Sequence, residues 1–372
     1  MAPTSRIAAR LADLSHGQLL EIASLGCEAS AEVKNRADTL LAAHKPLALW
    51  AVEGVLLSSD LVPHLLAPLR LEDGAAAAVC SRWAEGWKAT SEGRRRLRRV
   101  ALDFPPDLLG AEWLRMAVVP GDDEQLLVRS GTTVRILGRG MGTVSSFELS
   151  SIFGNVAASE EFIYVTEGGA GDIHCFTHAG TEVAKYEDPD KFIAYPVLAP
   201  GGLLFCVLYD DDDNTQDEIV ALDAQTMQPR HRFGLSLLND TRGMAVAGEE
   251  LFVCDCGNDR LQVFSLAGEH RRSITGEWKR PLTLCFVKDR LYLLEEYDDE
   301  DDDDNLNPLQ GRRIFVLSLQ GETLQVYTLP VRHQIEGPIF NGTLCCFDGK
   351  LLAPVRDWRS SFVRAVVALC GV

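Results

Sequence analysis

The stretch from Leu251 to Gly268, LFVCDCGNDRLQVFSLAG, decides the fold of this chain. Two short apolar segments flank a polar turn. Beyond the turn, Leu261 and Val263 face one way, while Gln262 faces the other. A period of two on either side of a short polar turn is typical of a β-hairpin. The stretch therefore predicts two antiparallel strands, and the question is whether they stand alone or recur along the chain.

Strands and turns of this kind recur roughly every 40 to 50 residues from residue 111 onward, a spacing close to that of propeller blades. Six units align on their second and third strands. The second strands are Gln125–Val128, Phe162–Val165, Leu203–Leu208, Leu251–Val253, Arg290–Leu294 and Lys350–Val355. The third strands are Val134–Leu137, Asp172–Phe176, Glu218–Leu222, Arg260–Phe264, Arg313–Leu317 and Phe362–Leu369. Because each unit alone would expose an apolar face, the units must pack together, which predicts a six-bladed propeller.

The ends of the repeat region predict how the ring closes. The sixth unit has a first strand at Thr343–Phe347 and two further strands, but no fourth strand before Val372. Leu97–Phe104 reads as a strand with no hairpin partner. We expect it to fill the outer position of the last blade, which would protect an open edge. Five or seven blades remain alternatives, because the region Val331–Gly342 is ambiguous.

The opening stretch also resembles one repeat of the NHL family, a small propeller blade unit with the pattern D-x-x-N-x-R-I-Q-V-F. The matching positions are Asp255, Asn258, Arg260, Leu261, Gln262, Val263 and Phe264. The resemblance implies a propeller built of similar blades. It does not imply an activity, because one fold serves many functions.

Residues 1–96 differ from the repeat region and predict an all-α domain. Their second half, about 57–96, resembles an F-box, which has a leucine-rich helical stretch, an acidic residue and a closing Val-Cys-x-x-Trp. Val79, Cys80 and Trp83 match the closing part, while Ser58 replaces the opening proline. The resemblance implies that a Skp-type adaptor binds through an apolar helical surface. The residues expected there are Leu57, Leu61, Leu65, Leu66, Leu69, Val79 and Trp83. The alternative is a helical cap that packs on the second domain.

The fold class expected for the whole chain is therefore α+β and multidomain. An F-box-like domain (1–96) precedes an all-β, six-bladed, NHL-like propeller (97–372, closed by strand 97–104). The 372 residues, 46% of them hydrophobic, are ample for two cores. Ten cysteines without a secretory signal indicate reduced thiols in the cytoplasm or nucleus. No apolar run reaches the roughly 18 residues that span a bilayer.

The formal net charge of −18 argues against nucleic acid and anionic membranes as partners. Two acidic runs, Asp210–Asp213 and Asp298–Asp304, follow second strands, as Asp255 and Asp259 do. Loops between equivalent strands emerge on one face, so a docking surface for a basic protein segment is predicted there. Its members are Asp210, Asp211, Asp212, Asp213, Asp255, Asp259, Asp298 and Asp299, with Arg356 and Trp358 in the sixth unit. A solvated insertion without a partner is the alternative.

No catalytic constellation is found in the sequence. The histidines are scattered, no Gly-x-Ser-x-Gly motif occurs, and the candidate first strands Met244–Ala247 and Leu282–Val287 are almost wholly apolar. We therefore expect no catalytic residue, no metal and no cofactor. The expected function is substrate recognition in an SCF-type ubiquitin ligase. The alternatives are an interaction scaffold without a ligase role and a metal-dependent propeller hydrolase.

Overall fold

The computed structural model describes residues 58, 61–67, 69, 76–91, 95–111, 114–152, 154–167, 171–210, 217–296, 311–330, 338–340, 342–357 and 362–372. The chain divides into two compact units. One comprises residues 1–96 with Gly371, and the other residues 97–370 with Val372. They are described separately. Within the described residues, no helix is both long and apolar enough to cross a membrane.

The described part of the first unit contains two helices, α5 (Val62–Leu66) and α6 (Ser81–Ala89). Pro63 lies in the first turn of α5, where the missing N–H costs nothing. The two helices meet at Gly86, because a Cβ atom there would lie only 2.6 Å from Val62 and 3.2 Å from Leu66. Most of the predicted all-α domain lies outside the described residues.

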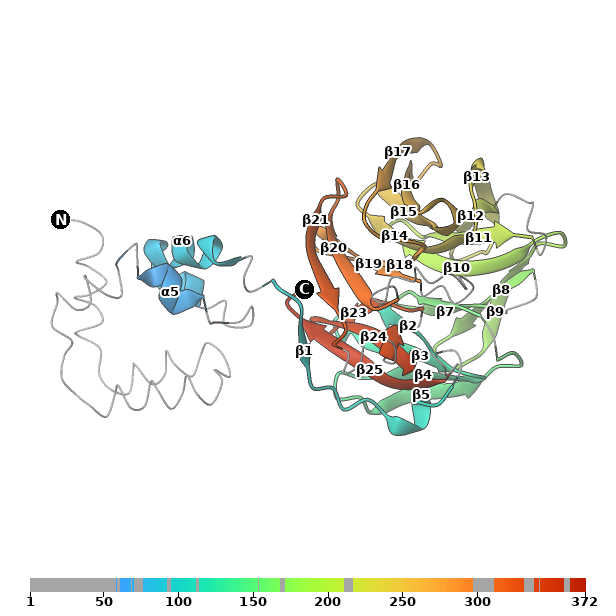
Figure 1. Cartoon of the computed structure of the whole chain (residues 1–372). Helices are drawn as coiled ribbons and strands as arrows, with labels where there is room; N and C mark the ends of the chain where they lie inside the picture. The colour runs from blue at the N-terminus through green and yellow to red at the C-terminus, as the bar shows by residue number, and fades with distance from the viewer. Residues whose placement is uncertain are drawn as a thin grey trace. The chain divides into compact units, whose positions relative to one another are not determined.

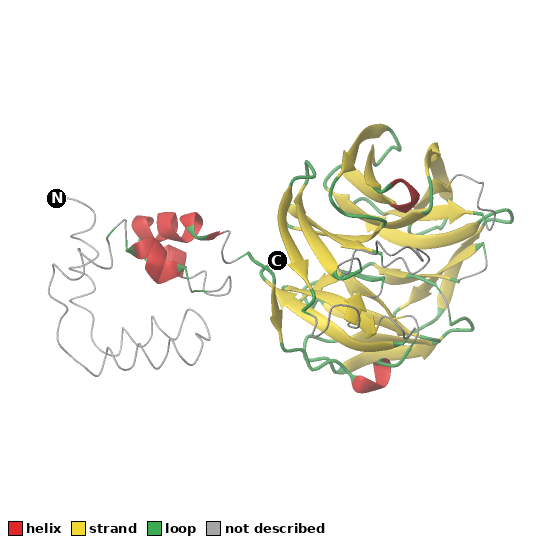
Figure 2. Ribbon diagram, in the orientation of Figure 1, coloured by secondary structure: helices red, strands yellow, loops and turns green. Residues whose placement is uncertain are grey.

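The second unit is a propeller of six antiparallel sheets, which confirms the predicted blade number (Figures 1 and 2). Blade 1 consists of β2 (Leu114–Val119), β3 (Gln125–Ser130), β4 (Thr133–Leu137) and β5 (Thr143–Glu148). Blade 2 consists of β6 (Val156–Ala158), β7 (Phe162–Thr166), β8 (Asp172–Thr177) and β9 (Glu182–Glu187). Blade 3 consists of β10 (Phe192–Ala199), β11 (Leu203–Tyr209), β12 (Asp217–Asp223) and β13 (Pro229–Leu238).

The remaining blades repeat this order of strands. Blade 4 consists of β14 (Thr241–Ala247), β15 (Glu250–Asp255), β16 (Arg260–Ser265) and β17 (His270–Thr275). Blade 5 consists of β18 (Pro281–Val287), β19 (Arg290–Glu295), β20 (Arg313–Ser318) and β21 (Thr323–Thr328). Blade 6 consists of β22 (Pro338–Phe340), β23 (Cys345–Phe347), β24 (Lys350–Asp357), β25 (Val363–Cys370) and β1 (Arg98–Val100). Every second and third strand therefore lies where the sequence predicted it.

Blade 6 differs from the others at both of its edges. Its inner edge is divided, because β22 and β23 both pair with β24. The ambiguous region 331–342 thus contributes part of an inner edge in its described residues. On the outer edge, β1 pairs antiparallel with β25, so that Arg98 lies opposite Cys370.

Six apolar clusters hold the ring together, one between each pair of neighbouring blades, including blades 6 and 1. The cluster between blades 4 and 5, for example, buries Phe252, Trp278 and Phe315 completely. Burial of an aromatic side chain of this size contributes about 2 to 3 kcal/mol. Because each sheet buries both faces against neighbours, its two middle strands are apolar almost throughout.

Glycine turns let the outer strands pack against the next blade. Gly180, Gly268 and Gly321 each have a φ angle between +85° and +91°. A Cβ atom at Gly268 would lie 2.7 Å from the Phe233 ring of the preceding blade. Phe147 sits in the same way against Gly180, and Ile274 against Gly321. The three glycines are therefore required both by their backbone angles and by a repeated contact between blades.

Candidate functional site

The turn between β15 and β16 is organised around one buried carboxylate. Asp255 has a fully buried side chain. Its Oδ1 accepts hydrogen bonds from the Asn239 backbone N–H and the Asn258 side chain, both at 2.9 Å. Its Oδ2 accepts from Arg260 Nε at 2.6 Å. Asn258 and Arg260, which belong with Asp255 to the NHL-like pattern, thus hydrogen-bond to Asp255, and Asp255 connects the hairpin to the loop that enters the blade.

Asp255 is consequently a structural residue and not an exposed member of the predicted acidic surface. A carboxylate that is buried and holds three donors offers nothing to a partner from solvent. Blade 5 carries the same device: Glu295 is fully buried, and Arg313 donates to it through Nε and Nη2, both at 2.6 Å. Burial raises the pKa of Glu295, although the Arg313 guanidinium opposes this shift.

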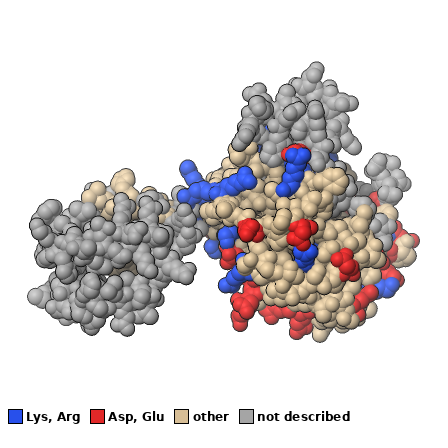
Figure 3. Space-filling view, turned by 90° about the horizontal axis from the view of Figure 1, so that it is seen from below, with Lys and Arg blue, Asp and Glu red and all other residues tan. Residues whose placement is uncertain are grey.

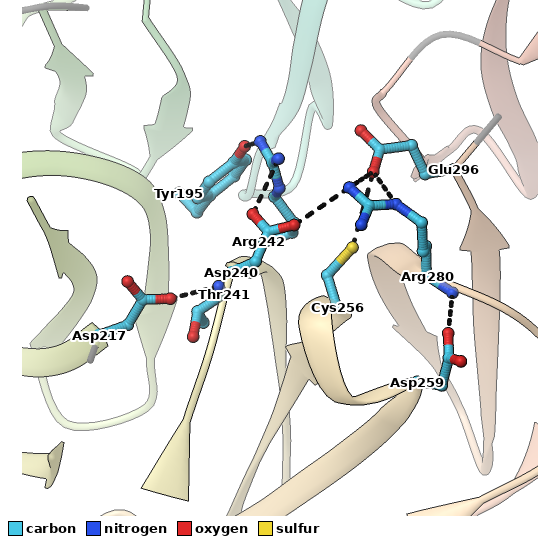
Figure 4. A network of polar contacts seen from close by, with 9 residues as sticks. All are labelled: Tyr195, Asp217, Asp240, Thr241, Arg242, Cys256, Asp259, Arg280 and Glu296. Carbon is cyan, nitrogen blue, oxygen red and sulfur yellow. Dashed lines mark hydrogen bonds and ion pairs between the residues drawn. The ribbon is translucent and has the colours of Figure 1, made fainter. Parts of the chain in front are cut away.

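A chain of polar contacts crosses blades 3, 4 and 5 on the same loop face (Figure 4). It begins at Tyr195 of β10, whose hydroxyl accepts from Arg242 Nη1 at 3.2 Å. Arg242 in turn pairs with Asp240 at 2.8 Å. Asp240 also pairs with Arg280 at 3.1 Å, and Arg280 Nη2 donates to Glu296 at 2.8 Å. The alternation of opposite charges stabilises each member and links three blades.

The backbone places these side chains through unusual angles. Tyr195, Asp240 and Arg280 have φ angles of +51°, +47° and +43°. Asp240 and Arg280 occupy equivalent positions, each directly before the first strand of its blade. Left-handed backbone costs roughly 1 to 2 kcal/mol for a residue with a Cβ atom. The loops of blades 4 and 5 therefore share one strained shape, which turns both side chains into the network.

Cys256 lies within this network but is poorly suited to nucleophilic chemistry. Its Sγ lies 3.6 Å from Glu296 Oε2, and the side chain is 1% exposed. Burial raises the pKa of its thiol, and the nearby carboxylates add to the effect. Asp240, Cys256 and Glu296 also have ligand atoms within 4.8 Å of one another. However, the Arg280 guanidinium bonds both carboxylates, so the position of a cation is already filled.

A central channel of about 360 Å³ runs between the first strands. Its wall includes residues of all six blades, among them Met244, Leu284 and Cys345, and exposes polar as well as apolar atoms. Arg115 and Tyr195 add polar groups where β2 and β10 line it. Burial lowers the pKa of Arg115, and the neighbouring Arg242 guanidinium lowers it further, while Tyr195 opposes the shift. The channel thus combines apolar side chains with a guanidinium group and a phenol group.

The aspartates of the predicted acidic surface that the structure describes, apart from Asp255, are engaged in ion pairs. Asp210 pairs with Lys191 at 2.8 Å, and Asp259 pairs with Lys279 at 2.9 Å. Figure 3, turned by 90° from Figure 1, shows another side of the propeller, where acidic side chains (red) and Lys and Arg side chains (blue) both lie on the surface. Arg356 lies in β24 and is half-buried. The other predicted members lie outside the described residues: Asp211, Asp212, Asp213, Asp298, Asp299 and Trp358.

The predicted adaptor-binding residues differ in how far their side chains are exposed. Leu61, Leu65 and Val79 are 42%, 43% and 53% exposed. Leu66 is instead fully buried beside Gly86, which makes it a packing residue of the helix pair and not part of an open surface. Leu69 and Trp83 are half-buried, and Leu57 lies outside the described residues.

Sequence reasoning missed the network of Arg242, Asp240, Arg280 and Glu296. The sequence signal is limited to a polar residue, Asp240 or Arg280, directly before the apolar first strand of blades 4 and 5, and the positive φ angle of both residues is seen only in the structure. The partners are distant in sequence, and only the packing of neighbouring blades brings them together. The half-buried Arg115 was missed for the same reason.

Comparisons with known proteins add likeness of shape only. No family model matches the chain, and no curated protein matches it. The crystal structure of BamB from Moraxella catarrhalis is 13% identical, with a TM-score of 0.45, covering 74% of this chain and 99% of that one. The computationally designed Ika8 protein is 11% identical, with a TM-score of 0.44, covering 70% of this chain and 71% of that one. The fold assignment therefore rests on the chain's own strand pairing.

Proposed function

We propose that this protein is the substrate-recognition subunit of an SCF-type ubiquitin ligase. The helical unit binds a Skp-type adaptor, and the propeller binds a protein substrate on its loop face. The chain itself performs no covalent chemistry and acts in the cytoplasm or nucleus. The F-box and NHL resemblances support this proposal, together with the propeller fold, which serves well as a scaffold for protein interactions.

The observation that carries the proposal is the distribution of apolar side chains on α5. Val62 and Leu66 are buried against α6, whereas Leu61 and Leu65 are more than 40% exposed. Packing within the helix pair accounts for the first two residues only. Val79, which is 53% exposed, precedes α6. Exposed leucines on a short helix suit an apolar groove of a partner.

Binding to a purified Skp-type adaptor tests the adaptor half of the proposal. We expect the full chain to bind, and the variant Leu61→Asp/Leu65→Asp to lose at least about tenfold in affinity, equivalent to 1.4 kcal/mol. Val144→Asp is the matched control, because Val144 is a 59% exposed residue of β5 in the propeller. Circular dichroism should show that both variants fold.

The outcome also separates the proposal from an interaction scaffold without a ligase role. A full chain that does not bind the adaptor, or a double aspartate variant that binds as well as the parent, would overturn the ligase proposal in favour of the scaffold, with the metal-dependent hydrolase as the other alternative. Capture of a substrate by the full chain in the presence of adaptor and cullin would complete the test. If the docking surface is acidic, capture should weaken as salt is raised.

A further inference from the structure

The hairpin of β7 and β8 in blade 2 gathers three metal-ligating side chains outside the network described above. Thr166 pairs with Ile173, so the next pair along the hairpin is Glu167 opposite Asp172. Directly opposite residues share a face, and His174 shares it with Asp172 because the two are separated by one residue. Their ligand atoms all lie within 4.8 Å of one another.

The imidazole of His174 is oriented by a fourth residue. Its Nδ1 lies 3.0 Å from Glu182 Oε1 on β9. Because an ionised carboxylate only accepts, Nδ1 must carry the proton of this hydrogen bond. In the neutral ring, Nε2 then holds a lone pair. A carboxylate that fixes the ring of a metal-binding histidine in this way is a frequent arrangement in metalloproteins.

When the ring is neutral, the lone pair of Nε2 lies close to the Asp172 carboxylate. Nε2 lies 3.2 Å from Asp172 Oδ2, yet the two atoms make no hydrogen bond. Both Nε2 and Asp172 Oδ1 are shielded from solvent and have no hydrogen-bond partner within the described part of the chain. A buried polar atom without a partner is destabilising. A cation between these atoms, either a metal ion or the second proton of the imidazole, would remove that penalty.

We propose that Glu167, Asp172 and His174 bind a divalent transition metal of the Zn²⁺ type, with Glu182 orienting His174. Zinc bonds to histidine nitrogen and carboxylate oxygen at about 2.0 to 2.1 Å, so tetrahedral ligands lie about 3.3 Å apart. The 3.2 Å between His174 Nε2 and Asp172 Oδ2 matches this spacing. An imidazole and only two carboxylates suit zinc better than calcium, which takes six to eight oxygen ligands.

A hydrogen bond also fixes the Glu167 side chain as a metal ligand. Ser150 Oγ of the preceding blade donates to Glu167 Oε1 at 2.9 Å, which leaves Oε2 for the metal. The contrast with Asp240, Cys256 and Glu296 is instructive, because there Arg280 bonds both carboxylates. Arg129 interacts electrostatically with Glu167, and Lys185 with Asp172, but among the described residues neither cation is within ion-pair distance of these carboxylates. The cluster of Asp240, Cys256 and Glu296, in which Arg280 fills the position of a cation, is thus an internal comparison for the cluster of Glu167, Asp172 and His174.

Titration of the full chain with Zn²⁺, followed by calorimetry, tests the site. We expect His174→Ala and Asp172→Asn each to bind one equivalent less than the parent, and Glu182→Gln to weaken that equivalent by about 10- to 100-fold. Cys256→Ser is the matched control and should bind as the parent does. Unfolding curves in chelator show whether each variant is folded.

Substitution by Co²⁺ identifies the ligands independently. A nitrogen and oxygen site should give visible d–d bands without thiolate-to-cobalt charge transfer, and these bands should be missing in His174→Ala. The proposal is wrong if the parent chain binds no equivalent of Zn²⁺ that is lost in both His174→Ala and Asp172→Asn. A cobalt spectrum dominated by thiolate charge transfer would overturn it as well.

Discussion

Blades 4 and 5 solve one structural problem with different sequences. In each, a buried carboxylate ends the second strand and pairs with an arginine that begins the third, Asp255 with Arg260 and Glu295 with Arg313. The partners in blade 4 are five residues apart, whereas those in blade 5 are separated by 18. The shorter hairpin yields a recognisable motif, and the longer one conceals the same pairing.

The two carboxylates differ in how they are satisfied. Asp255 collects donors from three places: the entering loop, its own turn and the next strand. Glu295 depends mainly on the two nitrogens of Arg313, and the backbone N–H groups of Lys279, at 3.5 Å, and Gly311 also contribute. Because the donors to Asp255 tie three separate segments together, we expect Asp255 to be the more critical residue.

The largest effect is expected for Asp255→Asn. The substitution places an amide NH₂ among donors and removes a buried charge that neutralises Arg260. Loss of one member of a buried pair costs about 3 to 5 kcal/mol, and because Arg260 is 31% exposed we expect about 3 kcal/mol. The free energy of unfolding in urea measures the effect.

Asp259→Asn in the same turn is the control. Its carboxylate is 40% exposed, and asparagine tolerates the φ angle of +53°. We expect a loss below about 1 kcal/mol. Equal losses at Asp255 and Asp259 would contradict the idea that burial and the number of donors decide the difference.

A smaller effect is expected for Glu295→Gln, about 1 to 2 kcal/mol, because the amide oxygen still accepts one bond from Arg313. Burial raises the pKa of Glu295, so its stabilising contribution is complete below the ordinary value of 4.5 and is lost as the pH rises through the folded-state pKa. Glu295→Gln has no group that ionises at this position. Its free energy of unfolding should therefore fall less than that of the parent as the pH rises from 4.5 through the folded-state pKa of Glu295. Unfolding curves between pH 4 and 8 would reveal it, and a loss larger than that of Asp255→Asn would reverse the ranking of the two blades.

The smallest effect concerns Glu250, which begins β15 at the position that Arg290 holds in blade 5. Hydrogen bonding to Arg272 lowers the pKa of Glu250. Its stabilisation is therefore present above 4.5 and is lost as the pH falls through the lower folded-state pKa. Because Glu250 is 31% exposed, we expect Glu250→Gln to cost only about 0.5 kcal/mol at pH 7 and nothing near pH 2. A cost that persists at low pH would point to packing instead of charge.

Much of the propeller could be predicted because the evidence for it is local. Period-two strands and the turn glycines Gly180, Gly268 and Gly321 depend on neighbours in sequence, and they placed all six hairpins. Alternation along a strand reflects which face is buried, so it survives without any similarity between blades.

The candidate site was less predictable because its contacts join blades. Arg280 reaches Asp240 across 40 residues and Arg242 reaches Tyr195 across 47. The prediction that Asp255 lies on an open surface was wrong for the same reason. The sequence placed Asp255 in the loop after the second strand, whereas it is the last residue of β15, and the contact from the Asn239 N–H could not be inferred.

The pairing of β1 with β25 has a consequence for the order of folding. Arg98 is synthesised early, while its partner Cys370 emerges from the ribosome some 270 residues later. Contacts of such long sequence separation form slowly because the intervening chain must first be ordered. The cluster shared by blades 6 and 1 therefore cannot close before Cys370 has been synthesised, and until then a nascent chain has unpaired strand edges. A chaperone that covers these edges would act on the ring before it closes and have little to bind afterwards.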